Sequence, residues 1–370
     1  MPILNKDFAD VSYLIKKDST IKNIPFTLIQ ISENEAKYVR LTGGLNLFFK
    51  FFKIDVDAIQ MCNIELIPVG ILLAIFSRKK IFYDCREDHF HAMLHSKVWF
   101  PKWFRYILGY GVKTIEFLAS KTFSGFIDSD PSIYRFHNMV PKSNKMIFYN
   151  MALKNQFKPG ESSKQRIFDF VVLGSMSVRT GVLDVVKALG RLKEEGEKIN
   201  LKLIGDPELD KVLWKQIEEI IKKHQLQDDI IITGRIPYFD IPNALSDCRI
   251  GVIPLLDLPK FRNNIATKQF EYMASGIPII ASKLDPQRYF IRKGHNGCHY
   301  EPGNVDELSD RMRELLHDKN KVKQYSQNCI NDVLNHKINS EEQQLKYLKF
   351  YQLRMENKSY VENQIPVLNG

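Results

Sequence analysis

The chain alternates short runs of β-branched and other apolar residues with longer stretches whose apolar residues recur every three to four positions. This alternation is typical of α/β proteins, in which helices join the parallel strands of a sheet. The 370 residues exceed one ordinary domain and suit two domains of roughly 150 to 200 residues each. We therefore expect two α/β domains with a ligand cleft between them, at the carboxyl ends of parallel strands.

The pattern predicts two series of strands and helices, separated by a polar segment. The first series has expected strands at Val11–Ile15, Thr27–Ile31, Ala58–Met61, Ile81–Asp84, Gly125–Asp128 and Lys145–Tyr149, and helices at Tyr38–Phe52, Glu65–Phe76 and Trp103–Ala119. The second series has expected strands at Phe168–Leu173, Leu201–Ile204, Ile230–Ile232, Ile250–Ile253 and Pro278–Ala281, and helices at Leu183–Glu194, Leu213–His224, Lys268–Ala274 and in the last 65 or so residues.

The polar segment MALKNQFKPGESSKQR contains a Pro-Gly pair and two serines but no hydrophobic period, which predicts a linker. We place the first domain at residues 1–155, the linker at 156–166 and the second domain at 167–336. The first expected strand leads to the second through KKDSTIKNIP, without the glycine loop that usually opens a doubly wound domain. The first domain therefore has an abbreviated start.

The chain is basic, with 53 Lys and Arg against 43 Asp and Glu. This excess favours anionic partners, such as phosphates, sugar nucleotides, lipid headgroups or nucleic acid. No signal peptide opens the sequence, and no apolar run reaches about 18 residues, so we expect a cytoplasmic protein that at most touches a membrane surface. The five cysteines are scattered and predict reduced thiols: Cys62, Cys85, Cys248, Cys298 and Cys329.

The most informative segment is GVIPLLDLPKFRNNIATKQFEYMASGIPIIAS, residues 251–282. Thr267 suits an N-cap and Gly276 a C′ position, so a short helix begins just above the carboxyl end of a buried strand. The amides of Ala266, Thr267 and Lys268, with the Lys268 ammonium, predict an anion site. Glu271 lies one turn on and can accept hydrogen bonds from sugar hydroxyls. This combination points to a nucleoside diphosphate.

The run KQFEYMASGIPIIAS resembles the donor-binding signature of the family 4 glycosyltransferases, which are retaining enzymes of GT-B architecture. The resemblance implies two Rossmann-like domains whose parallel sheets face each other across a cleft, with residues 337–370 forming a helix that crosses back to the first domain. VVLGSMSVRTGVLDVVKAL resembles the family's diphosphate-binding strand and helix, and Gly234–Pro237 resembles its nucleobase-contacting loop.

The family's functional positions carry over to this sequence as follows. Asn263 stands where the Glu-x7-Glu motif has its first glutamate, and Arg86 stands where many relatives have a histidine. The acceptor-side candidates are Asp84 and Glu87, and the resemblance implies no metal and no cofactor. The implied donor-binding residues are Gly174, Arg179, Gly181, Gly234, Arg235, Ile236, Pro237, Asn263, Ala266, Thr267, Lys268 and Glu271, among which Arg179, Asn263, Lys268 and Glu271 are the catalytic candidates.

The resemblance implies a retaining glycosyltransferase that moves a sugar from a UDP- or GDP-sugar to a hydroxyl acceptor. A lipid-linked glycan of surface polysaccharide biosynthesis is the expected acceptor. Two other interpretations stay open. One is a non-catalytic partner subunit that binds sugar nucleotides, which the asparagine at position 263 would fit. The other is a sugar-nucleotide epimerase of the same architecture.

Residues 96–121 interleave aromatic and basic side chains, including Trp99 and Trp103, at the start of an expected helix. This pattern favours contact with a membrane surface, and packing of these rings into the core is the alternative. Single-stranded nucleic acid is not expected. His91 and His95 have spacing that could chelate zinc, but a polar loop and helix start is the preferred interpretation. Asp128–Asp130 precedes a proline and favours a turn with a helix cap.

Overall fold

The computed structural model describes residues 13–16, 28–31, 43–86, 88–95, 99–157, 166–262, 264–336 and 338–361. The chain divides into two compact units. The first contains residues 1–149 and 344–363, and the second contains residues 150–343 and 364–370. All described strand pairs are parallel, so the predicted α/β class is confirmed.

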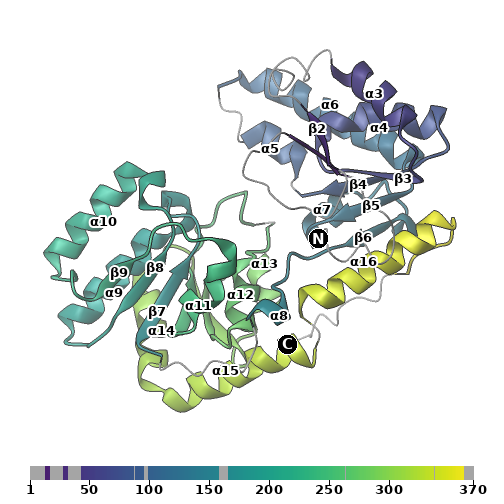
Figure 1. The fold of residues 1–370 in the computed structure, drawn as a ribbon. Helices are drawn as coiled ribbons and strands as arrows, with labels where there is room; N and C mark the ends of the chain where they lie inside the picture. The colour runs from purple at the N-terminus through teal and green to yellow at the C-terminus, as the bar shows by residue number, and fades with distance from the viewer. Residues whose placement is uncertain are drawn as a thin grey trace. The chain divides into compact units, whose positions relative to one another are not determined.

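The first unit is built on a four-stranded sheet of order β3-β4-β5-β6 (Figure 1). Its strands are β3 (Ala58–Met61), β4 (Lys80–Cys85), β5 (Gly125–Asp128) and β6 (Lys145–Ile147), and a separate pair joins β1 (Tyr13–Lys16) to β2 (Leu28–Ile31). Its helices are α3 (Gly43–Lys53), α4 (Ile67–Phe76), α5 (His89–His95), α6 (Lys102–Thr122) and α7 (Pro131–Phe136).

Strand β4 is buried on both faces because helices cover the sheet on both sides. Ile81 and Tyr83 pack with α3, α4 and α6 on one face. Phe82 points to the other face, where it packs against helix α16 (Ser340–Met355) and stacks on Tyr351 with ring centroids 4.0 Å apart. The C-terminal half of α16 therefore completes the core of the first unit.

The second unit has a six-stranded sheet of order β12-β11-β10-β7-β8-β9. The first strand along this unit, β7, lies in the middle; the chain runs outward to β9 and then returns to place β10 on the other side of β7. The strand order thus switches direction between β7 and β10. The strands are β7 (Phe168–Leu173), β8 (Leu201–Ile204), β9 (Ile230–Ile232), β10 (Cys248–Ile253), β11 (Ile279–Ser282) and β12 (Gly297–Tyr300).

The carboxyl ends of the two strands that flank such a switch point are where open α/β sheets bind their ligands. At such a point the connections leave the two strands toward opposite sides of the sheet, which opens a crevice between them in folds of this kind. The helices of this unit are α8 (Lys154–Phe157), α9 (Val182–Glu194), α10 (Lys211–Lys223), α11 (Ile241–Leu245), α12 (Lys268–Ala274), α13 (Asp285–Arg288), α14 (Val305–His317) and α15 (Lys319–Leu334).

The structure differs from the expected boundaries around the linker. Helix α8 lies in the polar segment, and Met151, Ala152 and Phe157 are buried in the second unit. Three apolar side chains give this segment a hydrophobic contact that its many polar neighbours obscure in the sequence. Residues 158–165 lie outside the described part of the chain. No helix among the described residues is both long and apolar enough to cross a membrane.

Candidate functional site

A glycine follows each of three neighbouring strands in the second unit: Gly174 after β7, Gly205 after β8 and Gly234 just beyond β9. Gly205 pairs with Gly234 in an isolated β-bridge. A Cβ atom on Gly205 would lie 2.1 Å from the carbonyl oxygen of Gly174, so no side chain fits there without moving the backbone. The carboxyl edge of this half of the sheet is therefore lined by backbone, whose N–H groups can approach a ligand closely.

The loop after β7 packs against the end of β10. Gly181 adopts φ +70°, and a Cβ atom there would lie 1.8 Å from the Pro254 carbonyl oxygen. The Leu256 amide donates to the Arg179 carbonyl oxygen at 3.4 Å, while the Arg179 side chain is exposed. The two loops at the switch point thus touch through their backbones, and the Arg179 guanidinium has no ion pair among the described residues.

Helix α12 is fixed to the switch point by Tyr272. Its buried hydroxyl accepts from the Leu173 amide at 2.9 Å and donates to the Val171 carbonyl at 3.2 Å. The ring covers Gly251 of β10, where a Cβ atom would lie 2.5 Å from it. One side chain thereby joins the helix to both strands of the switch point, which sets where the polar residues of α12 lie.

Lys268 reaches from α12 over the end of β7. Its Nζ atom lies 3.0 Å from where a Cβ atom on Gly174 would be. Lys268 and Glu271 are both half-buried, and neither side chain has a hydrogen bond or ion pair among the described residues. Burial lowers the pKa of Lys268 to about 8 and raises the pKa of Glu271 to about 7, and each charge only partly offsets the burial of the other. A cation and a carboxylate that lack partners in this way can bind a polar, anionic ligand.

The predicted nucleobase loop ends next to Glu271. Burial and the Glu271 carboxylate together raise the pKa of Tyr238, the residue after Pro237, to about 12. Gln156 of α8 donates to the Tyr238 carbonyl at 3.2 Å, so α8 is bonded to the end of this loop. Within the loop, Ile236 is half-buried whereas Arg235 and Pro237 are exposed. The loop and α12 therefore belong to one site.

The start of α12 differs from the expectation in two respects. Thr267 has helical backbone angles and its side chain caps nothing, because a capping side chain needs an extended backbone to reach the amides ahead. The Ala266 amide donates to Oε1 of the buried Gln287 at 3.4 Å, so it is not free. The amides of Thr267 and Lys268 have no partner within the described chain. The predicted C′ role of Gly276 is confirmed by its φ of +63°.

Two predicted residues, Asn263 and Glu87, lie outside the described residues. The acceptor-side candidate Asp84 is buried at the end of β4 in the first unit. Its carboxylate accepts from Arg86 through two bonds of 2.6 and 2.7 Å and from Gln60 at 2.7 Å. Asp84 therefore orients Arg86, and these three bonds occupy most of the acceptor capacity of its carboxylate. Its acceptor-side role stays a prediction.

Sequence reasoning missed three residues that shape the site: Gly205, Tyr272 and Gln287. Gly205 could have been found, since a glycine follows the apolar run directly at β7 and β8 and one residue later at β9. Tyr272 and Gln287 act through contacts across 99 and 21 residues of sequence, which no local pattern signals. The expected cap at Asp130 is confirmed, because its side chain accepts from the Ser132 and Ile133 amides at the start of α7.

Comparison with known proteins finds relatives among glycosyltransferases. Residues 153–332 match the family described as "Glycosyl transferases group 1". An uncharacterized glycosyltransferase of Methanocaldococcus jannaschii is 26% identical over 211 residues, which are 53% of this chain and 56% of that protein. The chain thus spans little more than half the length of this relative.

Two solved structures share the fold over both units. Sucrose-phosphate synthase from Thermosynechococcus elongatus has a TM-score of 0.73 at 15% identity, with 96% of this chain and 91% of that chain covered. The Anabaena protein HepE, solved with UDP and glucose, has a TM-score of 0.65 at 15% identity, with 89% and 86% covered. The expected fold of GT-B type is thereby confirmed, and residues 153–332 are similar to the glycosyl transferases group 1 family.

Proposed function

We propose that the protein is a retaining family 4 glycosyltransferase that moves a sugar from a UDP- or GDP-sugar to a hydroxyl acceptor. One observation carries the proposal: Lys268 and Glu271 are half-buried on α12 and have no partner among the described residues, and Lys268 reaches over Gly174 at the end of β7. A diphosphate beside Lys268 and ribose hydroxyls on Glu271 would give both charges the partners they lack.

Stabilisation of the leaving group is the main contribution of these residues. As the bond between the anomeric carbon and the diphosphate breaks, negative charge grows on the phosphate oxygens. The Lys268 ammonium, the Arg179 guanidinium and the amides of Thr267 and Lys268 are placed to stabilise that charge. Binding of an anion also raises the pKa of Lys268 above its value of about 8, which keeps the ammonium charged at neutral pH. These groups supply the positive charge without a metal or cofactor.

Retention follows if the acceptor attacks the same face of the sugar that the diphosphate leaves. The acceptor oxygen then bonds to the anomeric carbon, and the departing phosphate oxygen takes the hydroxyl proton. No protein nucleophile is needed for this step. The role of Asn263 is to contact the donor sugar, and that of the Gly234–Pro237 loop is to hold the base beside Glu271 and Tyr238. The UDP in the HepE structure supports a uridine donor as the first to test.

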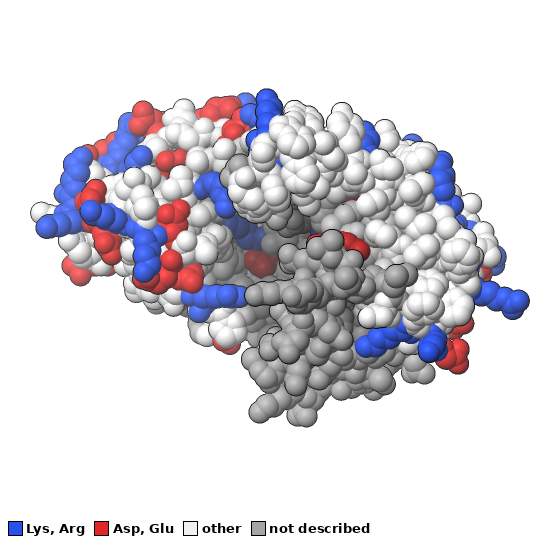
Figure 2. Space-filling view, turned by 90° about the horizontal axis from the view of Figure 1, so that it is seen from above, with Lys and Arg blue, Asp and Glu red and all other residues white. Residues whose placement is uncertain are grey.

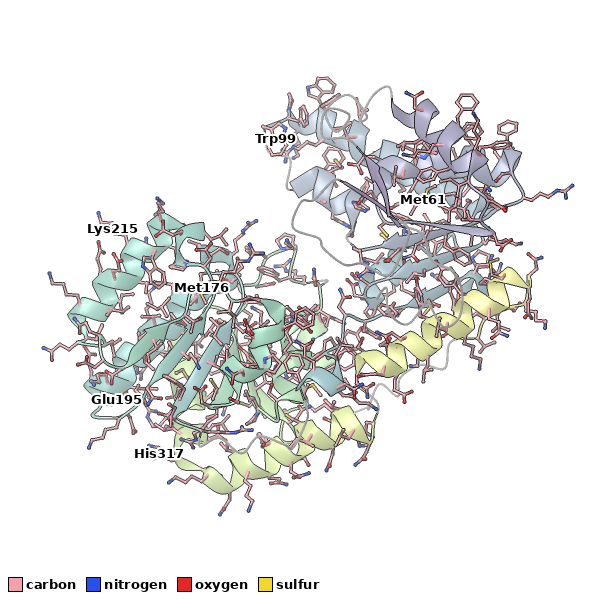
Figure 3. The ribbon with its side chains drawn as sticks, viewed as in Figure 1. Met61, Trp99, Met176, Glu195, Lys215 and His317 are labelled. Atoms are coloured by element: carbon pink, nitrogen blue, oxygen red, sulfur yellow. The ribbon has the colours of Figure 1, made fainter. Side chains whose placement is uncertain are left out.

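A lipid-linked glycan acceptor of surface polysaccharide biosynthesis suits the surface of the first unit. Trp103, Tyr106, Ile107 and Tyr110 lie on one exposed face of α6, and Trp99 just before the helix is 67% exposed. In Figure 3, Trp99 points outward from the first unit, whereas Met61 lies inside it. These rings therefore do not pack in the core, which supports peripheral contact with the inner face of a membrane.

The distribution of charged side chains also supports membrane contact through the first unit rather than the second. Figure 2 shows interleaved basic and acidic side chains over the second unit, on the left, and a broad area without charged side chains over the first unit, on the right. A surface of mixed charge keeps a protein hydrated, whereas a broad uncharged area with exposed rings suits the headgroup boundary of a bilayer.

The test is to incubate the full-length protein with a panel of UDP- and GDP-sugars and to measure nucleotide release and sugar products. A transferase releases nucleoside diphosphate slowly by donor hydrolysis and faster when a suitable acceptor is present. A non-catalytic partner subunit binds the nucleotide but releases none, and an epimerase yields a new sugar nucleotide or sugar from the donor alone. Either of these results would contradict the proposal.

A further inference from the structure

A cluster of ionisable side chains lies in the interior of the first unit, apart from the residues assigned to the donor. Cys85, Glu116 and His137 are all buried, and one ligand atom of each lies within 4.8 Å of the others. Asp128 joins the cluster, with Oδ1 2.7 Å from Nδ1 of His137. These residues come from the end of β4, the middle of α6, the end of α7 and the end of β5.

Burial of these groups leaves carboxylate oxygens in the core without a hydrogen-bond partner among the described residues. Glu116 is 1% exposed and Asp128 is 0% exposed. Atom Oε2 of Glu116 and atom Oδ2 of Asp128 have no hydrogen-bond partner among the described residues. Buried polar groups are ordinarily hydrogen-bonded or bound to a metal ion. Within the described part of the chain, two carboxylate oxygens beside this cysteine and histidine therefore lack a partner.

The geometry suits zinc. Nδ1 of His137 faces Asp128, which leaves Nε2 directed at Glu116, whose Oε1 is 3.7 Å away. A carboxylate on one ring nitrogen with the metal on the other is the usual arrangement of a zinc-binding histidine. Because Zn–N and Zn–O bonds are about 2.0 Å and Zn–S bonds about 2.3 Å, ligand atoms of a tetrahedral site lie roughly 3.3–3.8 Å apart. The distance between His137 and Glu116 falls in that range.

We propose that Cys85, Glu116 and His137 bind one zinc ion inside the first unit, with Asp128 orienting His137. Thiolate, imidazole and carboxylate together select zinc rather than calcium or magnesium, which prefer oxygen ligands alone. The Tyr83 hydroxyl donates to Oε1 of Glu116 at 3.5 Å and so helps to orient this carboxylate. The Cys85 thiol releases its proton to solvent when the metal binds.

The ion is structural, since it joins two strands and two helices deep in the core. Among the described residues, this is the one group of three or more possible ligands that the structure brings together. The earlier candidate, His91, instead pairs at 2.5 Å with Asp88 on the surface. A zinc ion here would stabilise the folded state by its binding free energy, because the unfolded chain does not bring these residues together.

The test begins with the full-length protein, purified without chelators and analysed by elemental mass spectrometry. We expect about one zinc ion per chain and a melting temperature that falls when a strong zinc chelator removes it and recovers when zinc chloride is added back. Cobalt(II) in place of zinc should give the visible absorption of a tetrahedral site together with a thiolate charge-transfer band. Three results together would overturn the proposal: no stoichiometric zinc in the purified protein, no uptake of zinc or cobalt(II), and a melting temperature that the chelator does not change.

Variants identify the ligands. C85S should abolish the thiolate band, whereas C248S, which changes a buried cysteine of the second unit, should keep it. E116Q is nearly isosteric and guards against loss of folding, and we expect it to weaken zinc affinity about 10-fold or more. A folded E116Q or C85S protein that retains zinc with unchanged affinity and an unchanged cobalt spectrum would contradict the assignment.

Discussion

The two units end their parallel strands differently. In the second unit, β7, β8 and β9 are followed by glycines, so backbone lines the edge of the sheet. In the first unit, the ends of β3 and β4 carry a network of side chains, in which Gln60 and Arg86 both bond to Asp84. A backbone-lined edge suits phosphates and a base, which many donors share, whereas a side-chain network suits one particular partner. The family model accordingly matches residues 153–332, which lie in the second unit.

The need for glycine at the strand ends of the second unit can be tested by substitution, for which we expect the largest change in stability. G205A places a Cβ atom 2.1 Å from the Gly174 carbonyl oxygen, so we expect a loss of about 4 kcal/mol in the free energy of unfolding or a failure to fold. The matched control is G111A in α6, where an added Cβ atom meets nothing and a gain of up to about 1 kcal/mol is expected. Chemical denaturation measures both, and equal stability of the two variants would break the comparison.

Removal of the Lys268 ammonium should affect turnover more than folding. We expect K268A to lower kcat for sugar transfer by roughly 10²- to 10³-fold, as when one group that stabilises a leaving group is lost. K215A changes an exposed lysine on α10, visible in Figure 3, and should leave kcat unchanged. Steady-state kinetics with a saturating donor decide between these outcomes. Wild-type kcat in K268A would show that the donor does not bind at α12.

Substitution of Arg86 tests whether the strand ends of the first unit bind the acceptor. If the strand ends of the first unit serve the acceptor, R86A should raise the acceptor KM by about 10-fold, which corresponds to one lost charge-assisted contact. Slow donor hydrolysis in the absence of acceptor should not change. R86K keeps the charge but loses the two-bond contact with Asp84. Its acceptor KM should therefore lie between those of the wild type and R86A. A change in donor hydrolysis without a change in acceptor KM would reverse the assignment of the two units.

The aromatic face of α6 predicts a further difference between the units. W103S removes a ring that is 65% exposed, so folding should be unaffected while binding to vesicles of anionic lipid weakens by roughly 10-fold. The control is F239S, which removes an exposed ring of the second unit and should not change vesicle binding. Co-sedimentation at low salt measures both, and equal binding by all three proteins would exclude this face.

The buried Glu271 carboxylate, which has no ion pair within the described residues, should cost stability when no ligand is bound. Its pKa of about 7 in the folded state lies above the ordinary value of 4.5, so the folded protein holds the proton more tightly, and this stabilisation disappears as the pH rises from 4.5 through 7. E271Q cannot ionise. We expect it to match the wild type near pH 5 and to exceed it by about 1 kcal/mol at pH 8, a modest gain because Lys268 loses its neighbour. A gain that is equal at both pH values would contradict the proposed burial.

Most of the fold was predictable because most buried strands are short apolar runs and the longer helices have a clear period or cap. Gly276 and Asp130 were found from local rules alone. Contacts between distant segments were not predictable in this way. The Gln287 side chain accepts a hydrogen bond from the Ala266 amide, 21 residues away in the sequence. Cys85, Glu116 and His137 come together only because distant elements pack against one sheet. Helix α8 escaped because its polar neighbours hide three buried apolar residues.

Calorimetry of UDP binding at pH 8, in buffers of different ionisation enthalpy, tests the donor site most directly. The Lys268 pKa of about 8 leaves its amine roughly half protonated there, and a bound diphosphate should draw in up to about half a proton. We predict that the wild type and K215A take up protons on binding, whereas K268A binds more weakly and takes up none. Wild-type affinity and proton uptake in K268A would show that the diphosphate does not contact this lysine.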